Sequence, residues 1–254
     1  MAESTVYSVL VICCISHFLN DMIQSIIPSI YPILKDKFDF SFAQIGIITL
    51  VFQITSSILQ PFTGLSADRP PSPQELSVGM CFTLAGLLML AFAENYLLIL
   101  LAVSVVGFGS SVFHPTASSV TQLASGGKKS LAQSIFQVGG NGGSALGPLL
   151  AALIILPFGQ HAISWFAIAA LLAALIMVRL GAWYKARLQY AVKHPRKAEA
   201  LNTHISRRAK YGALLILILL IFSKYFYTSC ITSYFTFYLI DKFGVSVQAS
   251  QICP

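Results

Sequence analysis

The sequence predicts an all-α, polytopic membrane protein, and both its composition and its long apolar segments support this fold class. Hydrophobic residues make up 56% of the 254 residues and charged residues only 10%, whereas a soluble domain carries about 25% charged residues. The mean hydropathy is +0.76. Because a single segment can satisfy its backbone polar groups inside lipid only as a helix, we expect transmembrane helices rather than a water-soluble globule.

Seven apolar segments are long enough to cross a bilayer as helices. They are Val6–Leu34, Gln44–Leu65, Leu76–Ala93, Tyr96–Phe113, Leu131–Pro157, Ile163–Tyr184 and Tyr211–Ile240. The connections between them are short, except for a basic stretch after the sixth segment. We therefore expect an N-terminal six-helix half over residues 1–184, a basic cytoplasmic linker over 185–210, and a last region, 211–254, that contains the seventh helix.

The distribution of Lys and Arg in the loops predicts that the amino terminus is cytoplasmic. Eleven basic residues fall in loops on one side: Arg69, Lys128, Lys129, Lys185, Arg187, Lys193, Arg196, Lys197, Arg207, Arg208 and Lys210. The other side carries Lys35, Lys37 and Lys242. This asymmetry accounts for the net charge of +7, so no nucleic-acid partner is expected. The basic linker is suited to contact anionic headgroups of membrane lipid.

The five cysteines predict neither a disulfide framework nor a metal site. Cys13, Cys14, Cys81, Cys230 and Cys253 show no CxxC or other metal-ligand spacing. Four of them lie in apolar segments, where a free cysteine behaves as a small apolar residue. The sequence thus indicates no cofactor and no metal.

The glycine-rich run "GGNGGSALGP" lies within the fifth apolar segment. Gly139, Gly143 and Gly147 recur every four residues, so one helix face is bare and another helix can approach it closely. Pro148 removes a backbone donor and allows a bend. No strand precedes the run, which argues against a nucleotide-binding loop.

Polar side chains interrupt four of the seven segments, in each case along one helical face. The first segment carries His17, Asn20, Asp21 and Gln24. The others carry Gln53 and Gln60 in the second, His114 in the fourth, and Gln133, Gln137, Asn141 and Ser144 in the fifth. The third and sixth segments have no such stripe. We therefore expect helices one, two, four and five to face a shared polar interior.

Asp21 is the candidate for proton coupling, because carboxylates within a membrane are rare and mark ion or substrate pathways. His17, one turn away, either pairs with Asp21 or bonds a backbone carbonyl. The stripe amides and hydroxyls either line a cavity or bond neighbouring helices. Lys224 either binds an anion or extends its amine to the membrane surface. An enzyme is not expected, because no nucleophile or oxyanion donor accompanies His17 and Asp21.

The loop "GLSADRPPSP" after the second segment carries the pattern G-x-x-x-D-R at Gly64, Asp68 and Arg69. It resembles the opening of the signature loop of the major facilitator superfamily, which latches the cytoplasmic gate; the basic tail of that signature is replaced here by prolines and a serine. The stretches "SHFLNDMIQS", "GSSVFHP" and "LAQSIFQVGGN" resemble drug/proton antiporters of that superfamily. After "FHP" in the fourth helix, the sequence pattern of these antiporters carries an acid and then an arginine, and this chain has Thr116 and Ser119 at those positions.

This resemblance implies a fold of twelve helices in two six-helix halves, with the central cavity on helices one, two, four and five of this half. It also implies alternating access and a proton-coupled secondary transporter in the bacterial inner membrane. Such an antiporter exports a small, drug-like and here anionic compound, so its partners are the small-molecule substrate and protons. Drug resistance is the expected phenotype.

An internal repeat relates the seventh segment to the first. "DKFDFS" at residues 36–41 reappears as "DKFGVS" at residues 241–246, and transporters are commonly built from duplicated halves. We therefore expect the N-terminal half of the fold plus a seventh helix, from a truncated gene. Such a chain transports after pairing with a separately encoded second half or with a second copy, or it is a non-functional, assembly-dependent fragment.

Overall fold

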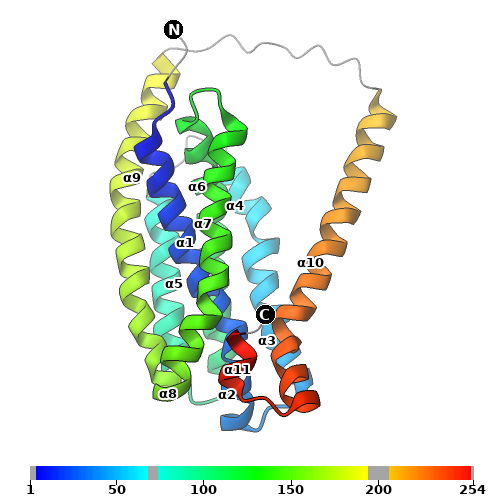
Figure 1. Ribbon diagram of the computed structural model, residues 1–254. Coiled ribbons are helices and arrows are strands. Elements are labelled where there is room, and N and C mark those ends of the chain that lie inside the picture. Colours follow the sequence, from blue (N-terminus) through cyan, green and yellow to red (C-terminus); the bar gives the residue numbers. More distant parts are fainter. Residues whose placement is uncertain (1–3, 68–73, 194–205, 253–254) are drawn as a thin grey trace.

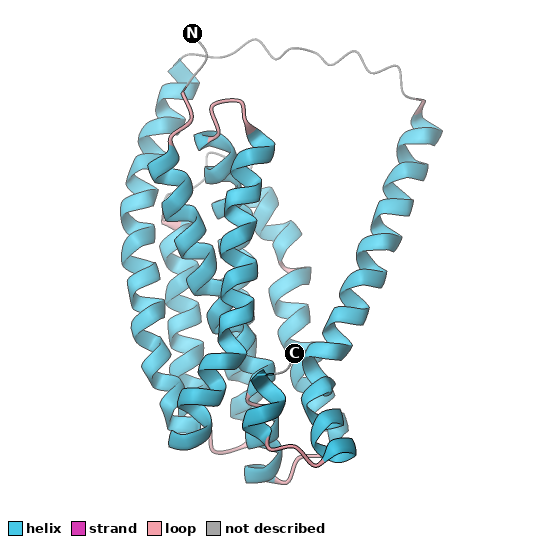
Figure 2. Ribbon diagram, viewed as in Figure 1, coloured by secondary structure: helices cyan, strands magenta, loops and turns pink. Residues whose placement is uncertain are grey.

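A computed structural model describes residues 4–67, 74–193 and 206–252 of the protein, and these residues form helices joined by loops, with no strand (Figures 1 and 2). The α-helices are α1 (Tyr7–Ser29), α2 (Tyr31–Phe38), α3 (Phe42–Gln53), α4 (Gln60–Ala67), α5 (Glu75–Ala91), α6 (Tyr96–Ala124), α7 (Lys129–Leu150), α8 (Leu156–Phe158), α9 (Ala167–Lys193), α10 (Arg207–Phe243) and α11 (Val247–Ile252). Two π-helical turns, Ile54–Ile58 and Ala151–Ile155, and a 3-10 helix, Gln160–Phe166, join some of them.

These elements form the expected helices with shifted ends. Six helical segments of the described chain are long and apolar enough to cross a membrane, and α5, with 17 residues, is a shorter apolar helix at the expected third position. The fourth helix continues beyond Phe113 to Ala124. Helix α9 continues past Tyr184 to Lys193, so the start of the expected linker is helical.

Small residues set the closest helix–helix contacts. A Cβ atom added to Gly139 or Gly143 of α7 would meet the backbone carbonyl oxygen of Cys14 or Phe18 on α1. One added to Gly147 would meet the Ser25 hydroxyl. The two backbones approach this closely only because glycine has no side chain, in agreement with the four-residue spacing. α5 packs in a similar way against α6, where a Cβ on Gly79 would lie 2.8 Å from the Gly109 carbonyl oxygen.

The loops gather at two opposite ends of the bundle (Figure 1). At the amino-terminal end, the Thr5 hydroxyl donates to the Ser125 carbonyl at 2.9 Å, which ties the start of α1 to the loop before α7. At the opposite end, the buried Gln160 amide donates to the carbonyls of Leu90 and Ala93 at 2.7 and 3.0 Å. The Lys37 amine in turn donates to the Gln160 Oε1 at 2.7 Å.

Helix α10 stands apart from the other helices at its Arg207 end and meets them near its carboxyl end (Figure 1). There the Phe237 ring packs edge-on against Phe42, with centroids 5.2 Å apart, and Ser233 is buried. The large apolar side chains along the rest of α10 are mostly exposed. Helix α10 is therefore joined to the other helices near its carboxyl end.

Candidate functional site

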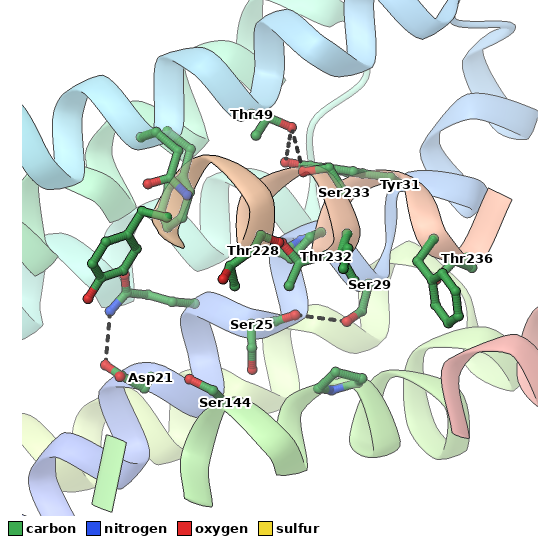
Figure 3. A pocket seen from close by; sticks show the side chains of 18 of the residues that line it. Asp21, Ser25, Ser29, Tyr31, Thr49, Ser144, Thr228, Thr232, Ser233 and Thr236 are labelled. Carbon is green, nitrogen blue, oxygen red and sulfur yellow. Dashed lines mark hydrogen bonds between the residues drawn. The ribbon is translucent and has the colours of Figure 1, made fainter. Parts of the chain in front are cut away.

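A cavity of about 390 Å³ lies where α10 meets the bundle (Figure 3). Its walls come from α1, α2, α3, α6, α7 and α10. The lining residues that belong to the predicted stripes are Asp21, Gln24, Gln53, His114 and Ser144. They come from all four predicted polar stripes, although they lie far apart along the chain.

Asp21 is the centre of a polar cluster at one end of this cavity. Its Oδ1 accepts hydrogen bonds from the Asn20 and Gln24 side-chain amides at 3.1 and 3.4 Å. Its Oδ2 lies 3.2 Å from the Nε2 of His17, and its Oδ1 lies 3.6 Å from the Nε2 of His114. Both carboxylate oxygens are therefore surrounded by polar groups, while the side chain keeps 19% of its surface exposed toward the cavity.

The hydrogen bond of the other His17 nitrogen defines the tautomer of its ring. Nδ1 lies 2.8 Å from the carbonyl oxygen of Phe136 on α7. A carbonyl oxygen only accepts hydrogen bonds, so Nδ1 carries a proton and donates it. The ring also stacks on the Phe136 ring, with centroids 3.9 Å apart. His17 thus makes both of the contacts that the sequence left as alternatives, one through each nitrogen.

His114 reaches the cluster from α6, one residue before a proline inside the helix. Pro115 has no N–H to bond the Ser111 carbonyl, and the hydroxyl of Thr63 on α4 donates to that carbonyl at 2.6 Å instead. This hydrogen bond from Thr63 to Ser111 joins α4 to α6 beside His114. The Asn20 and Gln24 amides reach the His114 Nε2 at 3.4 and 3.5 Å.

Hydroxyl groups form most of the remaining polar lining, and most of them lie outside the polar stripes predicted from the sequence (Figure 3). They belong to Ser25, Ser29, Tyr31, Thr49, Ser144, Tyr225, Thr228, Thr232, Ser233 and Thr236. The Thr49 hydroxyl donates to Tyr31 at 3.0 Å and lies 3.5 Å from the Ser233 hydroxyl, which links α3, α2 and α10. Serine and threonine are common in membrane helices, so only the three-dimensional arrangement distinguishes these positions.

Several predicted residues do not reach this cavity. The Gln60 amide donates to the Ser56 carbonyl of the preceding π-helical turn at 2.8 Å. Gln133 and Gln137 line a separate hollow near the start of α7, and Asn141 is exposed on α7 between that hollow and the cavity. Lys224 is exposed on α10, with its amine 5.4 Å from the centre of the Tyr225 ring.

The remaining sequence-predicted positions lie near the loops. Gly64 belongs to α4, whereas Asp68 and Arg69 lie outside the described residues. Thr116 and Ser119, which replace charged residues of the related pattern, each donate to a carbonyl of their own helix, at 3.0 and 2.9 Å. Both hydroxyls are satisfied within α6.

The long apolar helices and the polar cavity between them are the architecture of a membrane protein with an interior site. A sequence profile of the Major Facilitator Superfamily matches residues 13–254. The chain therefore belongs to this superfamily and is an integral membrane protein. The relatives of this chain are transporters rather than enzymes.

Two curated bacterial relatives align with nearly the whole chain. It is 52% identical over 248 residues to the fosmidomycin resistance protein of Escherichia coli (strain K12). It is 42% identical over 252 residues to YfnC, an uncharacterized MFS-type transporter of Bacillus subtilis (strain 168). Each alignment covers 98% of this chain and 61% of the relative, so the chain spans about three fifths of their length.

Solved structures of a bacterial homologue of the human lysosomal transporter Spinster share the fold. The inward-facing, occupied form gives a TM-score of 0.67 at 18% identity and covers 99% of this chain and 58% of that one. The inward-facing, unoccupied form gives a TM-score of 0.69 at 17% identity, and the match covers 98% of this chain and 59% of that one. At these identities the likeness concerns the fold alone.

Proposed function

We propose that this chain is the substrate-binding N-terminal half, with one further helix, of a proton-coupled exporter of a small anionic, fosmidomycin-type compound. The observation that carries the proposal is the polar cavity at Asp21, whose walls come from α1, α2, α3, α6, α7 and α10. The name of the Escherichia coli relative, a fosmidomycin resistance protein, supports the choice of compound. The location that fits this activity is the bacterial inner membrane, with the amino terminus in the cytoplasm.

The proton step is assigned to Asp21 together with His17. The Nδ1 atom of His17 already holds a proton. The His17 Nε2 and the Asp21 Oδ2 lie 3.2 Å apart, and both only accept hydrogen bonds until a second proton binds between them. That second proton is the one exchanged during transport. Because Asp21 borders the cavity, substrate bound beside it changes the environment of this proton directly.

Substrate binding is assigned to the hydroxyl-lined wall rather than to Lys224. Hydroxyl groups donate hydrogen bonds to an anion and accept them from neutral groups, and several of them surround the cavity (Figure 3). Lys224 is exposed on α10 and is not among the lining residues. Of the two alternatives for Lys224, we therefore favour the one in which its amine does not bind the anion.

The partner that completes the cavity is a second half, supplied by a separately encoded chain or by further sequence. The exposed apolar side chains of α10 support this part of the proposal, as do relatives longer than this chain. The alternative is that the chain alone is an assembly-dependent fragment without transport.

Drug susceptibility of cells tests the proposal. Cells that lack their own exporter would express this chain together with the matching second half of a relative. They should grow at fosmidomycin concentrations that stop cells with either part alone. Ser144→Leu, which fills the cavity from α7, should remove the resistance, and Ser134→Leu, exposed on the same helix away from the cavity, should keep it.

Two results would contradict the proposal. If the pair confers no resistance although both parts reach the membrane, this compound is not exported. If Ser144→Leu and Ser134→Leu give equal resistance, the cavity is not the route of the compound.

A further inference from the structure

We propose that His17, Asp21 and His114 form a binding site for a divalent transition-metal ion of the Zn²⁺ class, at the end of the transport cavity. One imidazole nitrogen from each histidine and one carboxylate oxygen lie within 4.8 Å of one another. The proposal goes beyond the proposed function, because metal binding to these side chains requires no transport.

The distances between the donor atoms suit such an ion. With bonds of 2.0–2.2 Å to nitrogen and oxygen, ligand atoms around tetrahedral zinc lie roughly 3.3–3.5 Å apart. The Nε2 of His17 and the Oδ2 of Asp21 are 3.2 Å apart, and the Nε2 of His114 and the Oδ1 of Asp21 are 3.6 Å apart. The His114 side chain is 23% exposed, and the donor atoms of all three residues lie within 4.8 Å of one another.

The His17 ring is held as a ligand histidine is held in metalloproteins. Its Nδ1 donates to the Phe136 carbonyl at 2.8 Å, which directs the lone pair of Nε2 toward Asp21. Ligating histidines almost always donate their second N–H to a carbonyl or carboxylate, and this partner fixes tautomer and orientation. The ring is 3% exposed and stacks on Phe136, so it cannot easily turn away.

Asn20 supplies a second, independent observation. It is fully buried, and its Oδ1 is a buried side-chain atom of the described chain without a hydrogen-bond partner. The other end of the same amide lies 3.1 Å from Asp21 Oδ1 and 3.4 Å from His114 Nε2. Rotation of the Asn20 amide about the Cβ–Cγ bond exchanges the positions of its nitrogen and oxygen. The oxygen then faces the ion and serves as a fourth ligand.

The backbone of α7 leaves room beside the donor atoms. A Cβ atom added to Gly140 would lie 2.7 Å from the Nε2 of His17 and 2.9 Å from the Oδ2 of Asp21. Any larger residue at this position would therefore crowd the two ligands. Asp21 and His114 also line the cavity, which gives an ion a route of entry.

The donor set decides the class of ion. Imidazole nitrogen suits Zn²⁺, Ni²⁺, Cu²⁺ and Fe²⁺, whereas Mg²⁺ and Ca²⁺ prefer sites made only of oxygen. Two imidazoles, one carboxylate and one amide oxygen match the first group. Co²⁺ replaces Zn²⁺ in such sites and reports its coordination through visible absorption.

Titration of the purified, tag-free chain in detergent with Co²⁺ alone tests the site. The unaltered protein should develop the visible absorption of four-coordinate Co²⁺ at one ion per chain, and Zn²⁺ should abolish it. His114→Gln and His17→Gln should each weaken binding at least tenfold, since even the loss of a supporting hydrogen bond weakens metal sites 10–100-fold, an order-of-magnitude figure. His161→Gln, at an exposed histidine of the 3-10 helix, should bind as the unaltered protein does.

Gly140→Ala gives a second variant that removes no ligand. It should weaken Co²⁺ binding, whereas Gly142→Ala on the exposed face of α7 should not. An unchanged Co²⁺ spectrum in both His17→Gln and His114→Gln would place the ion elsewhere and overturn the proposal. Absence of any four-coordinate spectrum in the folded, unaltered protein would overturn it as well. Neither result depends on whether the protein exports a drug.

Discussion

At the scale of single residues, the structure surrounds one carboxylate inside a membrane protein with two amide donors and two imidazole rings. Asn20 and Gln24 donate to Asp21, and the Ser110 hydroxyl donates to the Gln24 Oε1 at 3.0 Å and so orients the Gln24 amide. An isolated charge in such a place is costly, and ionisable groups in membrane segments usually pair with one another or face water-filled cavities. Asp21 does both.

The Thr63 hydroxyl is predicted to stabilise the α4–α6 contact. Thr63→Val keeps the shape of the side chain but removes the donor to the Ser111 carbonyl. That carbonyl has lost its helical partner to Pro115, so it would remain unpaired at a cost of about 1–3 kcal/mol. The midpoint of thermal unfolding in detergent should fall accordingly.

Thr116→Val is the matched control for this change. Its hydroxyl donates to the Val112 carbonyl of its own helix, where a backbone N–H is also available as a partner. The unfolding midpoint should therefore change much less. Equal midpoints for the two variants would show that the Thr63 bond does not hold the helices together.

At the scale of helices, glycine spacing determines how close α1 and α7 approach. Gly143→Ala should destabilise the bundle by about 1–3 kcal/mol, because overfilling a packed interface forces the backbones apart. The added methyl group would meet the Phe18 carbonyl oxygen and the Met22 amide nitrogen, the latter at 2.8 Å. Thermal unfolding of the purified variant measures the effect.

Gly142→Ala serves as its neighbouring control. There the added methyl group would lie 3.4 Å from the nearest Phe18 ring carbon, which is an ordinary contact. Alanine also favours a helix over glycine by about 1 kcal/mol. We expect unchanged or higher stability, and a loss equal to that of Gly143→Ala would mean that the glycine face has no special role in packing.

The helices and their polar faces could be predicted from sequence because both follow a simple period. Asp21, Gln24, Gln53 and His114 were singled out this way, and they line one cavity. The period does not give depth along the helix, which is why Gln133 and Gln137 belong to a different hollow. The helical period also does not predict that His114 lies beside Asp21, because that contact depends on how α1 packs against α6. The metal-ligand distances could not be predicted for the same reason.

At the scale of the whole molecule, the loops at the two ends differ in charge. The start of α1 and the loop with Lys128 lie at one end, and Lys37, Gln160 and the loop after α5 lie at the other. The excess of Lys and Arg predicts that the first end is cytoplasmic. Because the loops lie at two opposite ends, labelling one residue at each end tests the orientation directly.

Cysteine labelling in intact cells should show this orientation. In a chain whose native cysteines are replaced, Glu94→Cys should react with a membrane-impermeant thiol reagent, and Lys128→Cys should react only after the membrane is opened. Both positions are exposed in loops or at a helix end. The reverse labelling pattern would invert the orientation.

The central claim is that Asp21 carries the proton that drives export, and proton movement in vesicles tests it most directly. The chain and its second half would be reconstituted into liposomes with a pH-sensitive dye inside, and fosmidomycin would be added to one side. In the unaltered protein, protons should cross the membrane in the direction opposite to the drug. The control variant Asp39→Asn should show the same proton flux, because Asp39 is an exposed carboxylate in a left-handed turn that asparagine tolerates. Asp21→Asn, which keeps the shape but cannot bind and release a proton, should abolish that proton flux while drug binding persists. Undiminished drug-driven proton flux with Asp21→Asn would contradict the account.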